Sequence, residues 1–168
     1  MRVDHAEPAR LGKCSPLHRP VPGLACGVIS SPLDRIAECF ESLGPEIVER
    51  LSDYYCEAAE FSDPINTGRG LDDLRAIFED LFKQLKEVHI EINGRAGDAS
   101  QGFLRWTMRY KFRGKPRELE GVSHFTFAPD GRVASQHDFW DAAIGVYAEF
   151  PLVGSTLRGL RNLVRVRP

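Results

Sequence analysis

The candidates for carrying a proton during a reaction are three side chains whose positions in the sequence suit a cavity wall: Asp63, Asp138 and His124. Pro64 disfavours helical geometry at Asp63, so a strand should end there with the carboxylate beside a loop. That placement suits a residue that faces a cavity, and it equally suits a turn or cap residue. An apolar wall that includes Trp140 would raise the pKa of Asp138 toward a working pH. The alternative role for Asp138 is that of a salt-bridge partner.

Asp138 and His124 both fall in a predicted β-hairpin over residues 121–141, whose arms alternate polar and apolar side chains. Its turn is Ala-Pro-Asp-Gly at 128–131, where Pro presets φ, Asp can bond its own backbone and Gly tolerates a positive φ. Because side chains alternate across a strand, the length of this loop decides which of them face inward.

Two loop lengths remain open for this hairpin. A four-residue loop sets Ser123 opposite Gln136 and turns Gln136, Asp138 and Trp140 toward the inner face. A three-residue loop places His124 on the same face as those side chains. We favour the four-residue loop because it keeps the inner faces of the strands continuous, although a β-bulge would reverse the choice.

The preceding hairpin joins residues 101–113 to residues 116–127, with Gly114-Lys115 as its two-residue turn. This register makes two pairs of opposite charge on the outer face: Arg109 with Glu120, and Lys111 with Glu118. Opposite charges that face each other stabilise a strand pair by about 0.2–1 kcal/mol, which supports the register. The inner face then carries Leu104, Trp106, Met108 and Tyr110 from the first strand, and Leu119, Gly121, Ser123 and Phe125 from the second.

The predicted inner wall is mostly apolar, and a few polar groups converge on it: Ser123, Gln136, Asp138 and, at a strand end, Asp63. This composition is typical of a pocket for a small molecule. Trp106 and its apolar neighbours could equally fill a closed core. Spacing alone favours neither interpretation.

The elements that must position these residues begin at Ser31, which resembles an N-cap followed by a helix-opening proline. A second, shorter helix follows, and residues 54–63 turn from helix into a short strand. An apolar stripe over residues 71–85 predicts the strongest helix, and we assign that stripe to the core. Long strands then run from about residue 87 to residue 140 and predict an antiparallel meander. The fold class is therefore α+β, with a curved antiparallel sheet wrapped around N-terminal helices.

The bulk composition fits a single domain of a reducing compartment. The chain has 168 residues, a net charge of −2 and interspersed acids and bases, so nothing favours nucleic acid as a partner. Its cysteines have no metal-ligand spacing, and we expect free thiols, no metal and no cofactor. No apolar run approaches ~20 residues, and no secretory pattern occurs, which favours the cytoplasm.

The two ends of the chain differ from the middle. Residues 1–30 are rich in Pro, Gly and isolated charges, and we expect a disordered extension there. Residues 151–168 suggest a basic amphipathic helix or a tail. We favour a terminal helix that packs over the domain over one that contacts a membrane, because its apolar stripe is short and two glycines weaken it.

The order of motifs over residues 31–150 resembles the nuclear transport factor 2-like superfamily, in its SnoaL-like and ketosteroid-isomerase-like branch. The motifs are Tyr-Tyr-x-x-x-Ala-x-Phe-x-Asp-Pro, a Gly-led amphipathic helix, and Phe-x-x-Asp-Gly-Arg-Val ending in Asp-Phe-Trp-Asp. The resemblance implies a cone-shaped α+β barrel with an internal cavity. Members of the superfamily include isomerases, cyclases, epoxide hydrolases and non-catalytic binding proteins, so fold alone does not settle activity.

The resemblance also implies site residues. Asp63 matches the general base of ketosteroid isomerase, but that family's oxyanion-hole donors fall near Cys39 or Phe40 and at Ser123, and a supporting tyrosine at Phe78. Losing one such donor typically costs ~10²–10³ in rate, so ketosteroid isomerisation itself is not expected. The positions of Trp106, Met108, Leu119, Gly121, Gln136, Asp138 and Trp140 match that family's cavity wall.

SnoaL-type cyclases suggest a second assignment, in which Asp138 is the general acid/base and His124 tunes it, provided that the three-residue loop holds. The expected catalytic residues are therefore Asp138, Asp63 and His124. The expected ligand-binding residues are Tyr55, Trp106, Met108, Leu119, Ser123, Gln136 and Trp140. One hypothesis is an enzyme that acts on a small apolar molecule with one or two oxygens. The other is a non-catalytic binding module, or a module that forms a homodimer through the convex sheet face.

Overall fold

The structure, a computed structural model, describes residues 31–142 of the chain. The predicted extension at 1–30 and the predicted tail at 151–168 lie outside the described residues, as does the end of the 31–150 domain. The elements are α1 (Pro32–Glu41), η1 (Pro45–Arg50), α2 (Leu51–Tyr54), β1 (Tyr55–Ser62), β2 (Thr67–Arg69), α3 (Leu71–Gln84), β3 (Leu85–Gly97), β4 (Gln101–Phe112), β5 (Lys115–Phe127) and β6 (Val133–Trp140). The α+β class is confirmed, and only the short strand β2 is unforeseen.

Helix α1 begins where the sequence predicts. The Ser31 hydroxyl accepts a hydrogen bond from the Asp34 amide at 3.1 Å, and the Asp34 side chain accepts one from the Ser31 amide at 3.1 Å. This reciprocal capping satisfies donors that a helix end otherwise leaves unpaired. Arg95 of β3 forms an ion pair with Asp34 at 2.7 Å, which ties the helix to the sheet. Among residues 31–142, no helix has the length and apolar content needed to cross a membrane.

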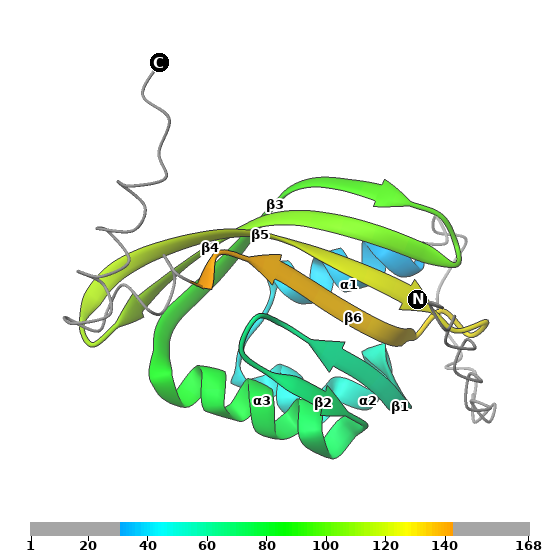
Figure 1. Ribbon diagram of the computed structural model, residues 1–168, viewed down its shortest axis with the longest axis horizontal. Coiled ribbons are helices and arrows are strands. Elements are labelled where there is room, and N and C mark those ends of the chain that lie inside the picture. Colours follow the sequence, from blue (N-terminus) through cyan, green and yellow to red (C-terminus); the bar gives the residue numbers. More distant parts are fainter. Residues whose placement is uncertain (1–30, 143–168) are drawn as a thin grey trace, which may run out of the picture.

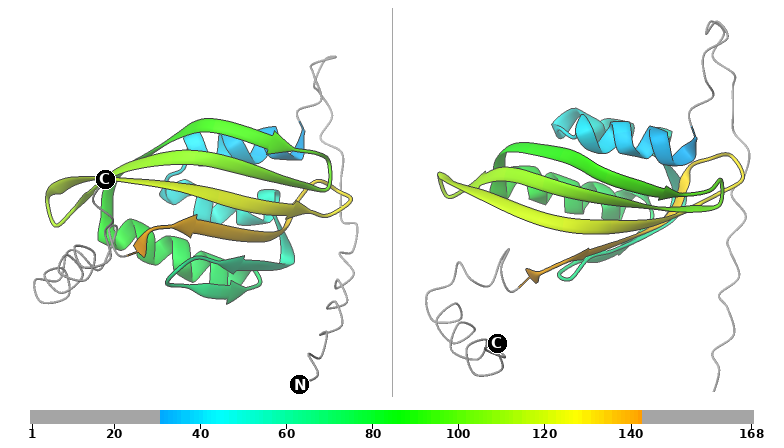
Figure 2. Two further views of the ribbon diagram at one scale, coloured as in Figure 1. Left: turned by 45° about the horizontal axis from the view of Figure 1, so that its top comes forward. Right: turned by 90° about the horizontal axis from the view of Figure 1, so that it is seen from above.

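The six strands form one sheet in the order β2-β1-β6-β5-β4-β3. Figures 1 and 2 show β3, β4 and β5 arching across the molecule, with the helices packed against the concave side. The expected antiparallel sheet is corrected at one place, because β1 pairs with β6 in parallel. The two edge strands β2 and β3 do not pair with each other, so the sheet is curved and unclosed.

The β4–β5 hairpin has the predicted faces but a different register. Its turn is Arg113-Gly114, with φ of 50° and 75°, and not Gly114-Lys115. Two positive φ values suit a two-residue turn whose twist matches the strands. Arg109 therefore lies opposite Glu118, and not opposite Glu120. The register moves by two residues, and because side chains alternate with period two, every inward residue stays inward.

The β5–β6 hairpin also departs from both expected loop lengths. Its loop spans residues 128–132, and a register shift lies between Thr126 and Phe127. Gly131 takes a φ of 80°, and its amide donates to the Ala128 carbonyl at 2.8 Å. Ser123 consequently lies opposite Asp138, and not opposite Gln136. The offset is again two residues over most of the hairpin, so the inner face is the one that the favoured loop predicts.

The three-residue loop, and with it a shared face for His124 and Asp138, is wrong. His124 lies opposite His137 in the ladder and stacks on Phe103 with ring centroids 4.5 Å apart. Phe103 is an exposed residue of the outer face. His124 therefore belongs to the convex side of the sheet, while Asp138 belongs to the concave side.

The core lies between the concave face and the helices. Helix α1 contributes Leu33, Ile36 and Phe40, and helix α3 contributes Leu74 and Phe78. The predicted α3 stripe also does more than build the core, because Ile77 and Leu81 line a cavity, and Ile77 at the same time packs against the core. Burial of apolar surface stabilises the fold by about 25 cal/mol per Å², so leaving these side chains against open space costs stability.

Candidate functional site

A cavity of about 390 Å³ opens between the concave face of the sheet and helix α3. This volume falls within the range of about 300–1,000 Å³ typical of small-molecule sites. Its wall is mainly apolar and comes from distant parts of the chain: Phe40, Phe61, Ile65, Ile77, Phe78, Leu81, Leu85, Ile90, Trp106, Met108, Phe112, Leu119 and Trp140. Strand β6 contributes the polar groups Gln136 and Asp138, and the loop after β1 contributes Asp63. Both carboxylates thus line one cavity.

Asp138 sits among polar partners in this apolar wall. The Gln136 side-chain amide, two residues away on the same face of β6, donates to both carboxylate oxygens at 2.9 Å. Ser123, directly opposite on β5, also hydrogen-bonds the Asp138 side chain. Asp138 is half-buried, because the open side of its carboxyl group faces the cavity.

Burial raises the pKa of Asp138 from its ordinary 3.8 to about 6. Desolvation penalises the charged form, and this is the largest cause. The hydrogen bonds from Ser123 and Gln136 oppose the shift because they favour the carboxylate, and the negative charge of Asp63 adds to it. The result is a carboxyl group that changes its protonation state close to neutral pH.

Two further side chains hold the partners of Asp138. The Tyr55 hydroxyl donates to the Gln136 side-chain carbonyl at 2.6 Å. The Trp106 indole N–H donates to the Ser123 hydroxyl oxygen at 2.9 Å. Tyr55 and Ser123 are fully buried, and neither lines the cavity. Both were expected to bind ligand directly, and the structure instead places them behind the wall.

Glycine at position 121 allows Trp106 to lie in the wall. Gly121 faces Trp106 across the β4–β5 ladder. A Cβ atom at position 121 would collide with the indole ring. Glycine within a strand often marks such a close approach, and here it is needed for the position of the indole that donates to Ser123. The sequence placed Gly121 on the cavity wall without indicating this function.

Asp63 lies at the rim, where it also serves the local turn. Its Oδ1 accepts hydrogen bonds from the Ile65 and Asn66 amides at 2.7 and 2.6 Å, and its Oδ2 accepts one from the Asn66 side chain at 3.1 Å. The two roles considered for Asp63 therefore coexist: its carboxylate stabilises a turn, and the residue lines the cavity.

The wall residues Met108, Leu119 and Trp140 line the cavity together with Trp106, Gln136 and Asp138. What the sequence did not indicate is the contribution of helix α3. Its residues Ile77, Phe78, Leu81, Asp80 and Gln84 line the cavity, and Asp80 accepts a hydrogen bond from Gln84 at the rim. An apolar stripe has the same composition whether it meets a core or a ligand, so no sequence signal could have separated the two roles.

The positions that the resemblance matched to the oxyanion-hole donors and the supporting tyrosine of ketosteroid isomerase carry other groups. Phe40 and Phe78 both line the cavity with apolar rings. Cys39 is buried, and desolvation raises the pKa of its thiol to about 12. Among residues 31–142, no three His, Cys, Asp or Glu side chains are grouped so that they could hold a metal ion.

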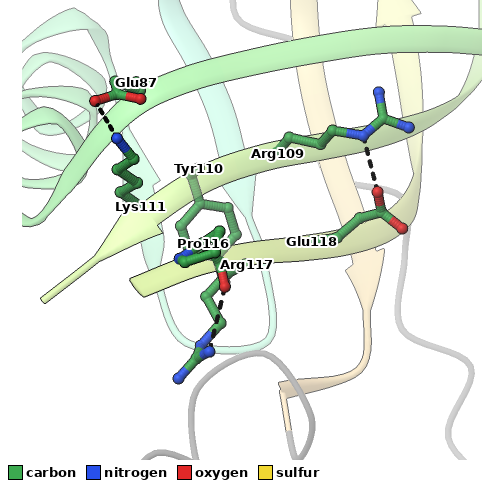
Figure 3. Close-up of a pocket in the computed structure, with 7 residues that line it drawn as sticks. All are labelled: Glu87, Arg109, Tyr110, Lys111, Pro116, Arg117 and Glu118. Atoms are coloured by element: carbon green, nitrogen blue, oxygen red, sulfur yellow. Dashed lines mark hydrogen bonds and ion pairs between the residues drawn. The ribbon is translucent and has the colours of Figure 1, made fainter. Parts of the chain in front are cut away.

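A second hollow of about 460 Å³ lies on the surface beside the β4–β5 turn. Figure 3 shows two ion pairs among its side chains and Arg117 bonded to the Pro116 carbonyl. Lys111 pairs with Glu87 at 2.6 Å, and Arg109 pairs with Glu118 at 2.8 Å. These groups are solvent-exposed and neutralise each other, which is the arrangement of a polar surface. The concave cavity, with its buried carboxyl group, is the better candidate site.

Comparison with known proteins identifies the family and the fold. A family model described as a SnoaL-like domain matches residues 36–136. No curated protein sequence matches the chain.

Three solved structures share the fold, each with a TM-score of 0.57. A hypothetical protein of Catenulispora acidiphila DSM 44928 with a ketosteroid isomerase-like fold, solved with trimethylamine, is 14% identical, and the match covers 67% of this chain and 86% of that one. An LEH-like epoxide hydrolase of M. tuberculosis is also 14% identical, with 79% of this chain and 94% of that chain covered. A nuclear transport factor 2-like protein of unknown function from Exiguobacterium sp. 255-15 is 16% identical, with coverage of 66% and 98%. At these identities the likeness shows the fold.

Proposed function

The chain belongs to the SnoaL-like domain family, and on that premise we propose that it binds a small, largely apolar molecule with one or two oxygens and moves a proton on it. The family's fold is shared by isomerases, cyclases and epoxide hydrolases, all of which act on such molecules. In this proposal Asp138 is the general acid/base. The chemistry is an isomerisation, a cyclisation or a hydrolysis.

The observation that carries the proposal is the position of the Asp138 carboxyl group. It faces an apolar cavity of ligand size, and burial raises its pKa to about 6. General acid–base catalysis is most effective when the pKa of the catalytic group lies near the working pH, because the group is then present in the required form and still exchanges protons readily. A carboxyl group that served only a surface ion pair would not need this desolvation.

The proton would move as follows. Above pH of about 6 the Asp138 carboxylate takes a proton from a carbon beside a ligand carbonyl, and the electrons of that C–H bond pass into the carbonyl as an enolate. The resulting carboxylic acid then returns the proton to another atom of the ligand, which completes an isomerisation or an aldol-type ring closure. Gln136 and Ser123 hold the carboxylate in place through both steps.

For an epoxide, the same group would act on water. Asp138 accepts a proton from a water molecule while the water oxygen bonds to an epoxide carbon and the carbon–oxygen bond of the ring breaks. The alkoxide that forms then takes a proton from the acid. Asp63 stands on the same cavity wall, and its negative charge keeps the pKa of Asp138 raised during the cycle.

The experiment compares turnover of cyclic ketones, polyketide-like compounds and epoxides by the wild-type chain and by Asp138→Asn. The variant keeps the size of the side chain but cannot accept the proton, so the rate should fall by ~10²–10⁴. His124→Asn is the matched control, since it changes a titratable side chain of the neighbouring strand on the opposite face. Equal rates for wild type and Asp138→Asn would remove Asp138 from the reaction.

We also propose that the chain forms a homodimer through the outer sheet face. Three apolar side chains are exposed there: Phe103 at 44%, Val122 at 36% and Phe139 at 61%. Beside them stand the exposed Arg105 and Glu120, which make no ion pair with any of the residues that the structure describes. Opposite charges that flank an apolar patch suit a two-fold interface, in which each partner supplies both.

Sedimentation at increasing concentration tests this assembly. The wild-type chain should shift toward the mass of a dimer, and Phe139→Glu should remain a monomer, because a charge in the interface would be desolvated without a partner. Ile65→Glu is the control, since Ile65 is exposed to 48% but lies at the cavity rim. A wild-type chain that stays monomeric at all concentrations would contradict the dimer.

A further inference from the structure

Tyr55 is buried to 99% and forms a short hydrogen bond to a residue far along the chain. Its ring is at the start of β1, and only 1% of its surface is exposed. Its hydroxyl lies 2.6 Å from the Gln136 side-chain carbonyl. Within residues 31–142, the Gln136 carbonyl is the one hydrogen-bond partner of the Tyr55 hydroxyl. Tyr55 is not among the residues that line the cavity.

The contact matters because a glutamine amide has two unlike ends. One end accepts hydrogen bonds and the other donates them. With the Tyr55 hydroxyl donating to the Gln136 carbonyl, the amide NH₂ points to Asp138 and reaches both carboxylate oxygens at 2.9 Å. If that hydroxyl were removed, the carbonyl would lose its donor and the amide could turn over. The carbonyl oxygen would then face the carboxylate and repel its charge.

A second chain of hydrogen bonds also ends at Asp138, and it runs from Trp106 through Ser123. The Trp106 indole can only donate, and it occupies the Ser123 oxygen at 2.9 Å. The proton of Ser123 is then available for Asp138, which accepts it. Both chains of hydrogen bonds therefore begin at a donor in the protein interior and end at the same carboxyl group. The arrangement favours the ionised form of Asp138 from two sides.

We propose that Tyr55 is a positioning residue: its hydroxyl locks the Gln136 amide in the orientation that donates to both carboxylate oxygens of Asp138. That Asp138 is the reactive group rests on the proposed function, whereas the lock rests on the contacts alone. Asp63 is the titratable group whose charge acts on Asp138, and Asp80 and Arg113 are the other charged groups that line the cavity. Desolvation raises the pKa of Tyr55 well above its ordinary value, so the hydroxyl remains a donor throughout.

The test follows the carboxyl carbon of Asp138 by ¹³C NMR while the pH is varied, with wild type and Tyr55→Phe compared. Phenylalanine keeps the ring and its packing 6.5 Å from Phe78, and it removes only the hydroxyl. The midpoint should rise by about one pKa unit, because a stabilising donor is lost and a repelling oxygen can replace it. Tyr54→Phe is the matched control, and it should leave the midpoint unchanged. An unchanged midpoint in Tyr55→Phe would overturn the lock.

A double-mutant cycle gives an independent reading. Gln136→Met removes the amide at similar volume and should raise the Asp138 midpoint by itself. Adding Tyr55→Phe to that variant should then shift the midpoint no further, since the hydroxyl acts only through the amide. Equal shifts from Tyr55→Phe in both backgrounds would overturn the relay. Should Tyr55→Phe fail to fold, 3-fluorotyrosine at position 55 replaces it: this stronger donor should lower the midpoint, and a constant midpoint would contradict the lock.

These titrations need no substrate, so they separate the two proposals. A shifted midpoint together with equal turnover by wild type and Asp138→Asn would overturn the catalytic role and leave the lock in place. A midpoint that does not respond to Tyr55, together with a large loss of turnover in Asp138→Asn, would overturn the lock and leave the catalytic role. In an active protein, the pH profile of the rate should move upward in Tyr55→Phe together with the midpoint.

Discussion

The two faces of strands β5 and β6 carry side chains of opposite character, although these side chains alternate along the same strands. On the concave face, Ser123 and Gln136 are fully buried and both hydrogen-bond Asp138. On the convex face, His124 and His137 stack 6.4 Å apart, and Phe139 is exposed. A single residue of register separates the proposed proton-transfer site from the patch proposed to bind a second copy of the chain.

The same contrast appears in two aspartates. Asp98, in the β3–β4 turn, accepts hydrogen bonds from the Ser100 side chain and from backbone amides, and these lower its pKa. Asp138 also accepts hydrogen bonds, yet burial raises its pKa to about 6. Hydrogen bonds to a carboxylate always favour its charge, so the sign of the shift is decided by how much water the site excludes. The concave face excludes enough water to reverse it.

The largest effect should appear in the pH dependence of stability. Asp138 has a raised pKa in the folded protein, so the folded state binds more protons than the unfolded state between about pH 3.8 and pH 6. Stability therefore falls as the pH rises through this window, and it is highest relative to an uncharged variant below it. The full shift corresponds to about 3 kcal/mol, and solvent at the cavity mouth reduces that figure.

Urea unfolding of wild type and Asp138→Asn at several pH values would measure this effect. The stability of the variant relative to wild type should increase from pH 4 to pH 6.5, by about 3 kcal/mol at most. Asp98→Asn on the exposed turn should give the opposite slope, and at lower pH: the pKa of Asp98 is lowered in the fold from its ordinary 3.8, so its contribution is present above about pH 3.8 and is lost as the pH falls below that value. A constant difference between wild type and Asp138→Asn would mean that Asp138 is not desolvated.

A substitution at Gly121 should disturb the packing of the concave face, and the loss in the free energy of unfolding should be smaller than the pH effect at Asp138. The new Cβ of Gly121→Ala meets the Trp106 ring, so the ring must move away from Ser123. We expect a loss of about 1–3 kcal/mol in the free energy of unfolding, as is usual for overpacking.

The matched outer-face control is Val122→Ala, one residue further along β5. Val122 is partly exposed, so its loss should cost about 0.5 kcal/mol or less. Thermal or urea unfolding of the two variants measures both values. If Val122→Ala cost as much as Gly121→Ala, the contrast between the two faces would be wrong.

The smallest effect should come from a substitution of Asp63 at the cavity rim. Asp63→Asn keeps an oxygen that can accept from the Ile65 and Asn66 amides, but it removes the negative charge that raises the pKa of Asp138. The Asp138 midpoint should therefore fall by a few tenths of a pKa unit. NMR titration detects a change of this size. A midpoint that rises in this variant would place Asp63 in a different electrostatic relation to Asp138.

Much of the fold could be predicted because local signals agree with it. Ser31 caps its helix as expected, and the strands from β3 to β6 occupy nearly the predicted residues. The register of both long hairpins could not be fixed, since a shift of two residues leaves every side chain on the same face. The opposite charges of Arg109 and Glu120 led to the wrong predicted strand register, because Glu118 can pair with the same arginine and does so.

The site could be predicted only in part. Asp138, Gln136 and Trp106 were expected in the cavity because alternation places them on one face. The separation of Tyr55 from the cavity could not be foreseen, since it depends on the parallel pairing of β1 with β6, which joins residues far apart in the sequence. The position of His124 outside the cavity depends on the register shift between Thr126 and Phe127, and no residue type in the sequence predicts that shift.

The most direct test of the account is the titration of the Asp138 carboxyl carbon in the wild-type protein. We predict a midpoint near 6, well above the ordinary value of 3.8. We also predict that a neutral apolar ligand that fills the cavity will move the midpoint upward, because the ligand removes the remaining water. A midpoint near 4 that no ligand changes would contradict the claim that the concave face holds a desolvated, proton-transferring carboxyl group.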